Sequence, residues 1–241
     1  VWVFKSGSPL GPFNPVRKGS VPPPGWMCLD GTLWGENGEP WMVFCREWYQ
    51  TGNGRMMAAP MSRDLSRFTS GPVELFRAAD APGGWRVTDG PFLLRTKDGV
   101  LRMIWSNFVK DCGYCILQCA SESGSVRGPW KNHMPLYTQN GGHAMLFRRF
   151  GDGRLTLALH QPNTPPDERL HLYPVDQTDR GLRIAAAPAA FVDPFVGTAG
   201  TGHTFAFVDP FVGMTGTGHT FPGACVPFGL VQASPDIGTG E

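Results

Sequence analysis

Three side chains capable of acid–base chemistry recur along the chain at intervals of roughly 55 residues. Asp30 lies in the segment LDG, Asp89 in TDGP and His143 in GGH. Two carboxyl groups can divide general acid and base work when one keeps its proton and the other stays ionised. An apolar run follows each position, and a carboxylate is costly to bury beside such a run for packing alone. The alternative is that Asp30 and Asp89 are turn residues, since Asp-Gly is common in turns.

The segments that carry these residues are repeated patterns of short strands. After Asp89, the apolar runs PFLL and VLRMIW flank the turn KDG, and Asp-Gly between apolar runs is a hairpin signal. The same order follows Asp30 and His143, and further short strands complete each unit. Four strands per unit are typical of a β-propeller blade, whose first strand lines a central channel. We therefore predict an all-β fold, a partial β-propeller with about three blades plus a strand of a preceding blade.

Composition supports a folded domain and excludes some classes of partner. Apolar residues make up 41% and charged residues 17% of the 241, so a sizeable core is possible. Gly (32) and Pro (23) are frequent, which favours many short strands joined by turns. The net charge of +1 gives no electrostatic reason to bind nucleic acid or an anionic membrane. No apolar run reaches the ~20 residues of a membrane helix, so we expect neither partner.

The cysteines Cys112, Cys115 and Cys119 form a C-x2-C-x3-C cluster. A zinc site needs a fourth ligand, and a zinc ribbon needs a second C-x2-C pair that the sequence lacks. Strand alternation places Cys115, Leu117 and Cys119 on one face. We therefore favour buried free thiols in a sheet core over a metal site.

The three motifs, in this order and within matching repeats, resemble the five-bladed propellers of glycoside hydrolase family 43 over residues 1 to about 185. That family includes β-xylosidases, α-L-arabinofuranosidases, arabinanases and exo-galactanases. The resemblance implies an inverting glycosidase acting on arabinose-, xylose- or galactose-containing oligo- or polysaccharides. It implies a carbohydrate partner, no required cofactor, a structural calcium ion as an option, and a periplasmic or secreted location. The alternatives are a catalytically inactive propeller that binds carbohydrate, and a non-functional fused fragment.

The resemblance also implies roles for the three residues. Asp30 matches the aspartate that orients the general acid and modulates its pKa. Asp89 stands at the general acid position, where the family usually has a Glu whose side chain is one methylene longer. His143 matches the axial histidine that helps to hold a metal ion or water. The family's general base belongs to an early blade, which we expect upstream of Val1, so we predict residues 1–182 to be an incomplete glycosidase domain.

Aromatic side chains are a second carbohydrate signal, because the C–H faces of sugars stack on rings. Trp26 and Trp48 lie near the motif positions, and we predict that both bind substrate. His160 ends the second strand of the unit that begins at His143. It is a further substrate-binding candidate, with the capping of a sheet edge as its alternative.

The composition and the sequence pattern of the chain change after residue 182. Residues 183–190 are predicted to be a linker, and residues 191–241 contain the near-duplicates FVDPFVGTAGTGHTFA and FVDPFVGMTGTGHTFP. The second copy and the following PFG resemble the opening of glycoside hydrolase family 92, the calcium-dependent exo-α-mannosidases. That family's catalytic residues lie far downstream of this opening. We expect a poorly ordered extension, and both a second module and a joining artefact remain open.

Overall fold

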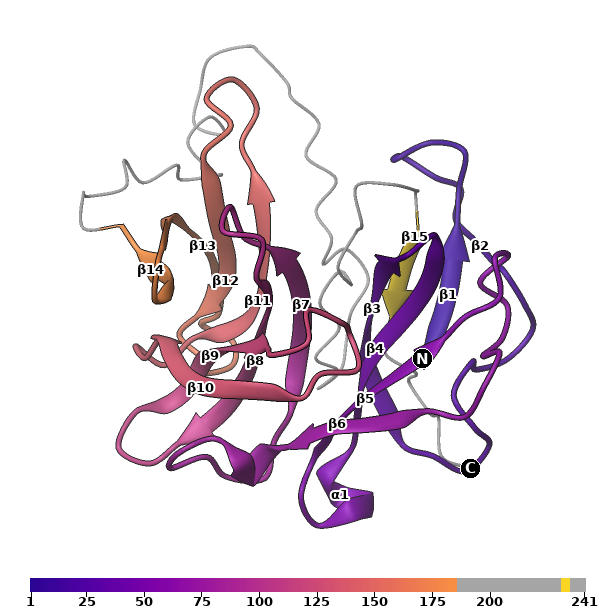
Figure 1. Cartoon of the computed structure of the whole chain (residues 1–241), viewed down its shortest axis with the longest axis horizontal. Helices are drawn as coiled ribbons and strands as arrows, with labels where there is room; N and C mark the ends of the chain where they lie inside the picture. The colour runs from indigo at the N-terminus through magenta and orange to yellow at the C-terminus, as the bar shows by residue number, and fades with distance from the viewer. Residues whose placement is uncertain (186–230, 235–241) are drawn as a thin grey trace.

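The computed structural model describes residues 1–185 and 231–234, and nearly all of its regular structure is antiparallel β-sheet (Figure 1). Three four-stranded sheets follow in chain order and are called blades II, III and IV. Blade II contains β3 (Cys28–Glu36), β4 (Glu39–Arg46), β5 (Arg55–Pro60) and β6 (Val73–Arg77). Blade III contains β7 (Asp89–Arg95), β8 (Leu101–Val109), β9 (Gly113–Ser121) and β10 (Trp130–Tyr137). Blade IV contains β11 (Gly142–Arg148), β12 (Leu155–Gln161), β13 (Arg169–Thr178) and β14 (Gly181–Ile184).

A fourth sheet, called blade I, brings together two distant parts of the chain. Its order is β15 (Val231–Ser234), β1 (Trp2–Lys5) and β2 (Asn14–Pro15). The fold predicted from the repeats, an all-β partial propeller of three blades and part of another, is therefore confirmed. β14 extends to Ile184, two residues beyond the expected domain end at 182, because it pairs with β13. Apart from β15, the linker from residue 186 onward, the duplicated segment and the family 92 resemblance lie outside the described residues.

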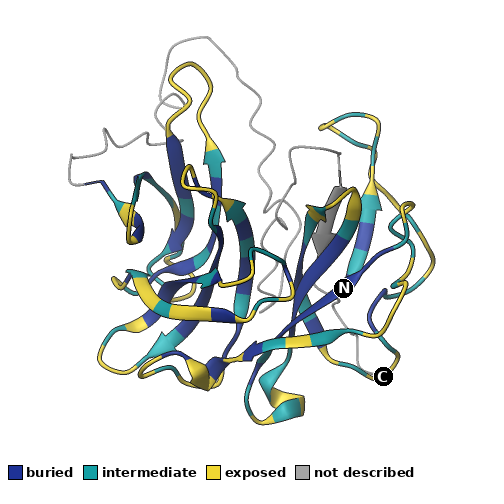
Figure 2. Ribbon diagram, viewed as in Figure 1, coloured by how far each residue is buried: buried dark blue, intermediate teal, exposed yellow. Residues whose placement is uncertain are grey.

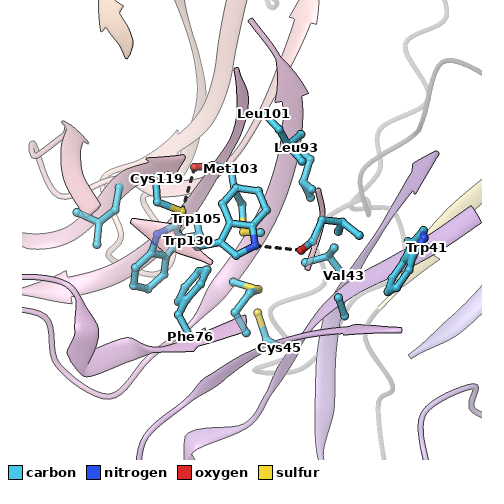
Figure 3. Close-up of a cluster of buried hydrophobic side chains, with 14 of the residues drawn as sticks. Trp41, Val43, Cys45, Phe76, Leu93, Leu101, Met103, Trp105, Cys119 and Trp130 are labelled. Carbon is cyan, nitrogen blue, oxygen red and sulfur yellow. Dashed lines mark hydrogen bonds between the residues drawn. The ribbon is translucent and has the colours of Figure 1, made fainter. Parts of the chain in front are cut away.

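The blades pack face to face, so their central strands are buried on both sides (Figure 2). In β4, Val43 and Cys45 face a cluster shared with blade III, while Met42 and Phe44 face a cluster shared with blade I. This alternation follows from the two-residue period of a strand. Figure 3 shows the cluster between blades II and III, where Trp105 of β8 is fully buried. A third cluster fills the space between blades III and IV.

The cysteine prediction is confirmed within the described part of the chain. Cys115 and Cys119 of β9 are free thiols and buried, and Cys112 is free and half-buried in the turn before β9. Cys119 packs in the cluster between blades II and III and lies 3.8 Å from the carbonyl oxygen of Met103 (Figure 3). Burial raises the pKa of the Cys115 thiol to about 11. Burial also raises the pKa of the Cys119 thiol, so Cys115 and Cys119 stay protonated at neutral pH and serve packing.

Hydrogen bonds as well as apolar contacts join neighbouring blades. The buried amide of Gln118 in β9 donates to the Leu182 carbonyl and accepts from the Leu182 N–H, both at 2.8 Å. Glu36 at the end of β3 accepts from the Ser125 hydroxyl and the Val126 N–H, both at 2.6 Å. Each contact satisfies backbone or side-chain groups that would otherwise lose water on burial. The blades are thus held in a fixed relation, on which any site between them depends.

Replacing Gln118 by Ala is expected to lower the free energy of unfolding by roughly 2–4 kcal/mol, because it leaves the Leu182 N–H and carbonyl buried without partners. The measurement is urea unfolding followed by far-UV circular dichroism. Gln177→Ala is the matched control, since Gln177 accepts a single exposed bond from the Lys97 N–H at 2.8 Å. Its expected cost is under about 1 kcal/mol. Equal losses for both variants would contradict the proposed role of the Gln118 amide.

Candidate active site

The first strand of each of blades II to IV begins with the same backbone irregularity. Pairing with the second strand shifts between Leu29 and Thr32, between Asp89 and Phe92, and between Gly142 and Met145. Such a shift is the signature of a β-bulge, in which an extra residue bends the strand. The residues at the bulge have the left-handed φ values 54°, 51° and 51°, and they are Asp30, Gly90 and His143.

This equivalence corrects the sequence alignment of the repeats. Asp30 and His143 are structurally equivalent, as expected, but Asp89 is equivalent to Leu29 and Gly142, one residue earlier. The extra residue of a bulge is unpaired, so motif spacing alone cannot reveal an offset of one. Asp89 therefore enters the site from a different backbone position than Asp30.

Asp30 connects three blades through one carboxylate. Its side chain is almost fully buried, and its Oδ2 accepts a 2.9 Å hydrogen bond from the backbone N–H of Gly90. Its Oδ1 lies 3.5 Å from Nε2 of His143. Gly90 has to be small, because an added Cβ would lie 3.3 Å from the Cα of His143 and φ is positive. The bulges of blades II, III and IV thus meet around Asp30.

Asp89 has the electrostatic setting of a carboxylic acid that keeps its proton. Its Oδ2 accepts a 2.8 Å hydrogen bond from the hydroxyl of Tyr114. Loss of surrounding water, and next the charge of Asp30, raise the pKa of Asp89 to about 7, while His143 and Tyr114 oppose this rise. An acid with a pKa near the working pH is suited to donate a proton during a reaction.

Tyr114, the second residue of β9, belongs to the site although the motifs did not indicate it. Burial and the carboxylate of Asp89 raise its pKa well above the usual value, so its hydroxyl is a neutral donor. Gly142 leaves room for the ring, because an added Cβ would lie 2.3 Å from Cε1 of Tyr114. The hydroxyl of Ser106 accepts the His143 N–H at 2.9 Å and fixes the third bulge.

Glu47 is a third carboxyl group near the site, and it was also not predicted. It is half-buried immediately after β4, and its backbone N–H donates to the Met27 carbonyl at 2.8 Å. Loss of water raises the pKa of Glu47, a hydrogen bond from the Tyr49 backbone opposes the rise, and the charge of Asp30 adds to it. In turn, the charge of Glu47 adds slightly to the rise at Asp89.

The other predicted residues occupy two different environments. His160 is buried, its ring stacks on Tyr114 with centroids 5.7 Å apart, and its Nε2 lies 2.9 Å from Oδ1 of Asn163. Trp48 begins the helical turn α1 (Trp48–Thr51) at the same end of blade II as Asp30. The guanidinium carbon of Arg46 lies 3.9 Å from the centroid of the Trp26 ring. The structure thus brings together Asp30, Asp89, His143 and His160. Trp26 instead packs against the apolar cluster between blades I and II.

The structure places the carboxylate of Asp30 beside His143, where a metal ion or water is predicted. No group of three or more His, Cys, Asp or Glu side chains within residues 1–185 is placed to hold a metal ion. Calcium takes six to eight oxygen ligands, and a single carboxylate beside an imidazole supplies few of them. A bound ion or water at His143 remains a prediction, and no chemical step below is routed through one.

Comparison with known proteins identifies the family to which this chain belongs. The sequence model of glycosyl hydrolases family 43 matches residues 1–184, and the chain therefore belongs to this family. An endo-arabinase from Bacteroides thetaiotaomicron is 39% identical, with a TM-score of 0.68 over 73% of this chain and 68% of that one. Comparison with curated protein sequences gave no match.

More distant structures share the fold. A thermostable family-43 glycoside hydrolase is 19% identical, with a TM-score of 0.64 over 76% of this chain and 65% of its own. An endo-1,4-beta-xylanase from Bacteroides thetaiotaomicron is 23% identical, with a TM-score of 0.61 over 76% and 66%. The chain thus spans about two thirds of the length of these proteins. No helix of the described residues is long and apolar enough to cross a membrane.

Proposed function

We propose that the protein is a glycoside hydrolase of the inverting type that acts on pentose-containing polysaccharides, in the first place on arabinose-containing ones. The observation that carries the proposal is the pKa of the Asp89 carboxyl group, which loss of water and the nearby carboxylate of Asp30 raise to about 7. Family membership and the 39% identity to an endo-arabinase support the reaction and the substrate class. The more distant xylanase supports only the fold.

Asp89 is proposed to be the general acid. It donates its proton to the glycosidic oxygen as the bond to the sugar carbon breaks, while water attacks the opposite face of the sugar and gives its proton to a general base other than Asp30 or Asp89. The Tyr114 hydroxyl holds one oxygen of Asp89 in place, and its hydrogen bond also stabilises the carboxylate left after proton transfer. Asp30 keeps the proton on Asp89 by its charge and positions β7 through Gly90.

The roles of the histidines are proposed to be binding and positioning. His143 lies beside Asp30, where an imidazole can hold a sugar hydroxyl or a water. His160 supports the ring of Tyr114 from blade IV. Cys45 is excluded as a nucleophile, because burial and the charges of Asp30 and Asp89 raise its pKa well above the usual value and keep the thiol neutral.

The experiment is incubation of the full chain with linear arabinan, arabinoxylan and galactan, followed by proton NMR of the first anomer released. We expect sugar release from arabinan with inverted configuration at the anomeric carbon. Release with retained configuration would overturn the inverting mechanism. Absence of release from every substrate would overturn the hydrolase proposal itself.

A carbohydrate-binding propeller without turnover is the second candidate. One observation favours it: the side chain at the acid position is the shorter Asp, and Tyr114 already holds one of its oxygens. Arabino-oligosaccharide binding by calorimetry, without sugar release over days, would support this candidate. A measured turnover would exclude it.

A further inference from the structure

A group of aromatic side chains continues outward from the site around blade III. The ring of Phe108 lies 5.0 Å from that of Tyr114, and the ring of Trp85 lies 6.1 Å from that of Phe108. Trp48 follows at 5.6 Å from Trp85, and Tyr49 stacks on Trp48 at 4.0 Å. The series begins at the residue whose hydroxyl binds Asp89, so it connects directly with the proposed proton donor.

The outer end of this series is exposed to solvent. Trp85 is 50% exposed and Tyr49 is 74% exposed, although both are large aromatic residues. Trp48 lies between them and is half-buried. A contiguous exposed aromatic surface beside a site is uncommon in soluble proteins and marks a place where a ligand binds.

The backbone that carries Trp85 is held rigidly. The Trp85 N–H donates to the Phe108 carbonyl at 2.9 Å, and Gly84 pairs with Val109. Gly84 packs so closely that an added Cβ would lie 2.7 Å from Nδ2 of the fully buried Asn107. The backbone that carries the Trp85 ring is therefore positioned before any ligand arrives, which lowers the entropic cost of binding.

We propose that Trp85, Trp48 and Tyr49 form a binding platform for a sugar unit on the leaving-group side of the cleaved bond, so that the protein takes extended neutral arabino-oligosaccharides. This rests on the proposed function. We assign the platform to that side because Trp85 connects through the rings of Phe108 and Tyr114 to Asp89, the proposed donor to the leaving oxygen. Flat aromatic rings suit the C–H face of a neutral sugar.

The test compares binding of arabinose oligomers of one, three and six units by calorimetry. It uses the full chain carrying Asp89→Asn, which prevents cleavage during the measurement. We expect the six-unit oligomer to bind more tightly than the three-unit one. Adding Trp85→Ala should weaken six-unit binding about tenfold, as expected for loss of one aromatic stacking partner, and change single-sugar binding less than twofold.

Two controls separate the platform from general effects of mutation. Phe150→Ala removes a fully exposed aromatic ring in the turn at the other end of blade IV, and it should leave six-unit binding unchanged. Trp85→Phe keeps a flat ring and should retain most of the affinity. Equal affinity for all lengths, or no effect of Trp85→Ala, would overturn the proposal.

The outcomes also distinguish the platform from the hydrolase proposal. Length-dependent binding that needs Trp85, without any sugar release by the unmutated chain, would leave the platform standing and reject the hydrolase. Sugar release from arabinan without length-dependent binding would reject the platform and leave the hydrolase standing.

Discussion

Replacing Asp89 by Asn is expected to remove at least about 99% of the sugar-releasing activity and to make the protein more stable at pH 8. Asn cannot donate an acidic proton, so the leaving oxygen would depart as a poor leaving group. Its amide nevertheless keeps an oxygen that can accept the Tyr114 hydroxyl. The loss of activity therefore comes from chemistry and not from a collapse of the site.

The stability change follows from proton linkage. The pKa of Asp89 is raised from 3.8 to about 7 in the folded protein. Between these values the folded state holds a proton that the unfolded state has released. The contribution of Asp89 to stability is thus fully present below about pH 4, falls as the pH rises and is lost above about pH 7. The loss has an upper limit of about 4 kcal/mol for a shift of roughly three pKa units.

Urea unfolding at pH 5 and at pH 8 measures this effect. The amount by which Asp89→Asn exceeds the parent in free energy of unfolding should grow by roughly 1–3 kcal/mol between pH 5 and pH 8. Asp179→Asn, a substitution at an exposed turn position, should give the same small difference at both values. A difference for Asp89→Asn that does not change with pH would contradict the raised pKa.

Replacing Asp30 by Asn is expected to lower the pKa of Asp89 from about 7 toward its ordinary value of 3.8, because the charge of Asp30 is the second largest cause of the rise. Asn keeps an oxygen that can accept the Gly90 N–H, so the link to β7 remains. The alkaline limb of the pH–rate profile should move to lower pH. At neutral pH the rate should fall roughly tenfold for each unit by which the pKa drops.

Carbon-13 NMR titration of the Asp89 carboxyl measures the same shift without any need for turnover. Glu47→Gln is the graded control, because the charge of Glu47 is a smaller cause of the rise and should shift the pKa less, in the same direction. An unchanged or higher pKa in Asp30→Asn would exclude Asp30 as the group that keeps Asp89 protonated.

The sequence was sufficient for the blades because the physics there is local. The second strand of blade II, β4, carries apolar residues on both faces. Gly99, which has a positive φ, marks the turn between β7 and β8. Asp30 and His143 were found together because both occupy the bulge at a strand start. The one-residue offset of Asp89 was missed, because a bulge changes pairing without changing the motif.

The rest of the site depends on contacts between strands that are not direct neighbours, both within a blade and between blades. Asp30 meets the Gly90 N–H across 60 residues, and Tyr114 reaches Asp89 across 25. Glu47 follows the end of β4, the second strand of blade II. The first strand, β3, begins at this same end of the blade. The end of a second strand and the start of a third strand lie at the same edge of a blade as the bulges, and this is the pattern that indicates Glu47 and Tyr114. Their distances from Asp89 could not follow from spacing.

The bond from Asp30 to the neighbouring blade ends on a main-chain N–H, that of Gly90. A backbone donor is present whatever side chain precedes it, so residue 89 can change without loosening the architecture. Asp89→Glu would therefore keep this link between the blades while extending by one methylene the reach of the carboxyl group that we propose as the proton donor. This position is thus suitable for redesign.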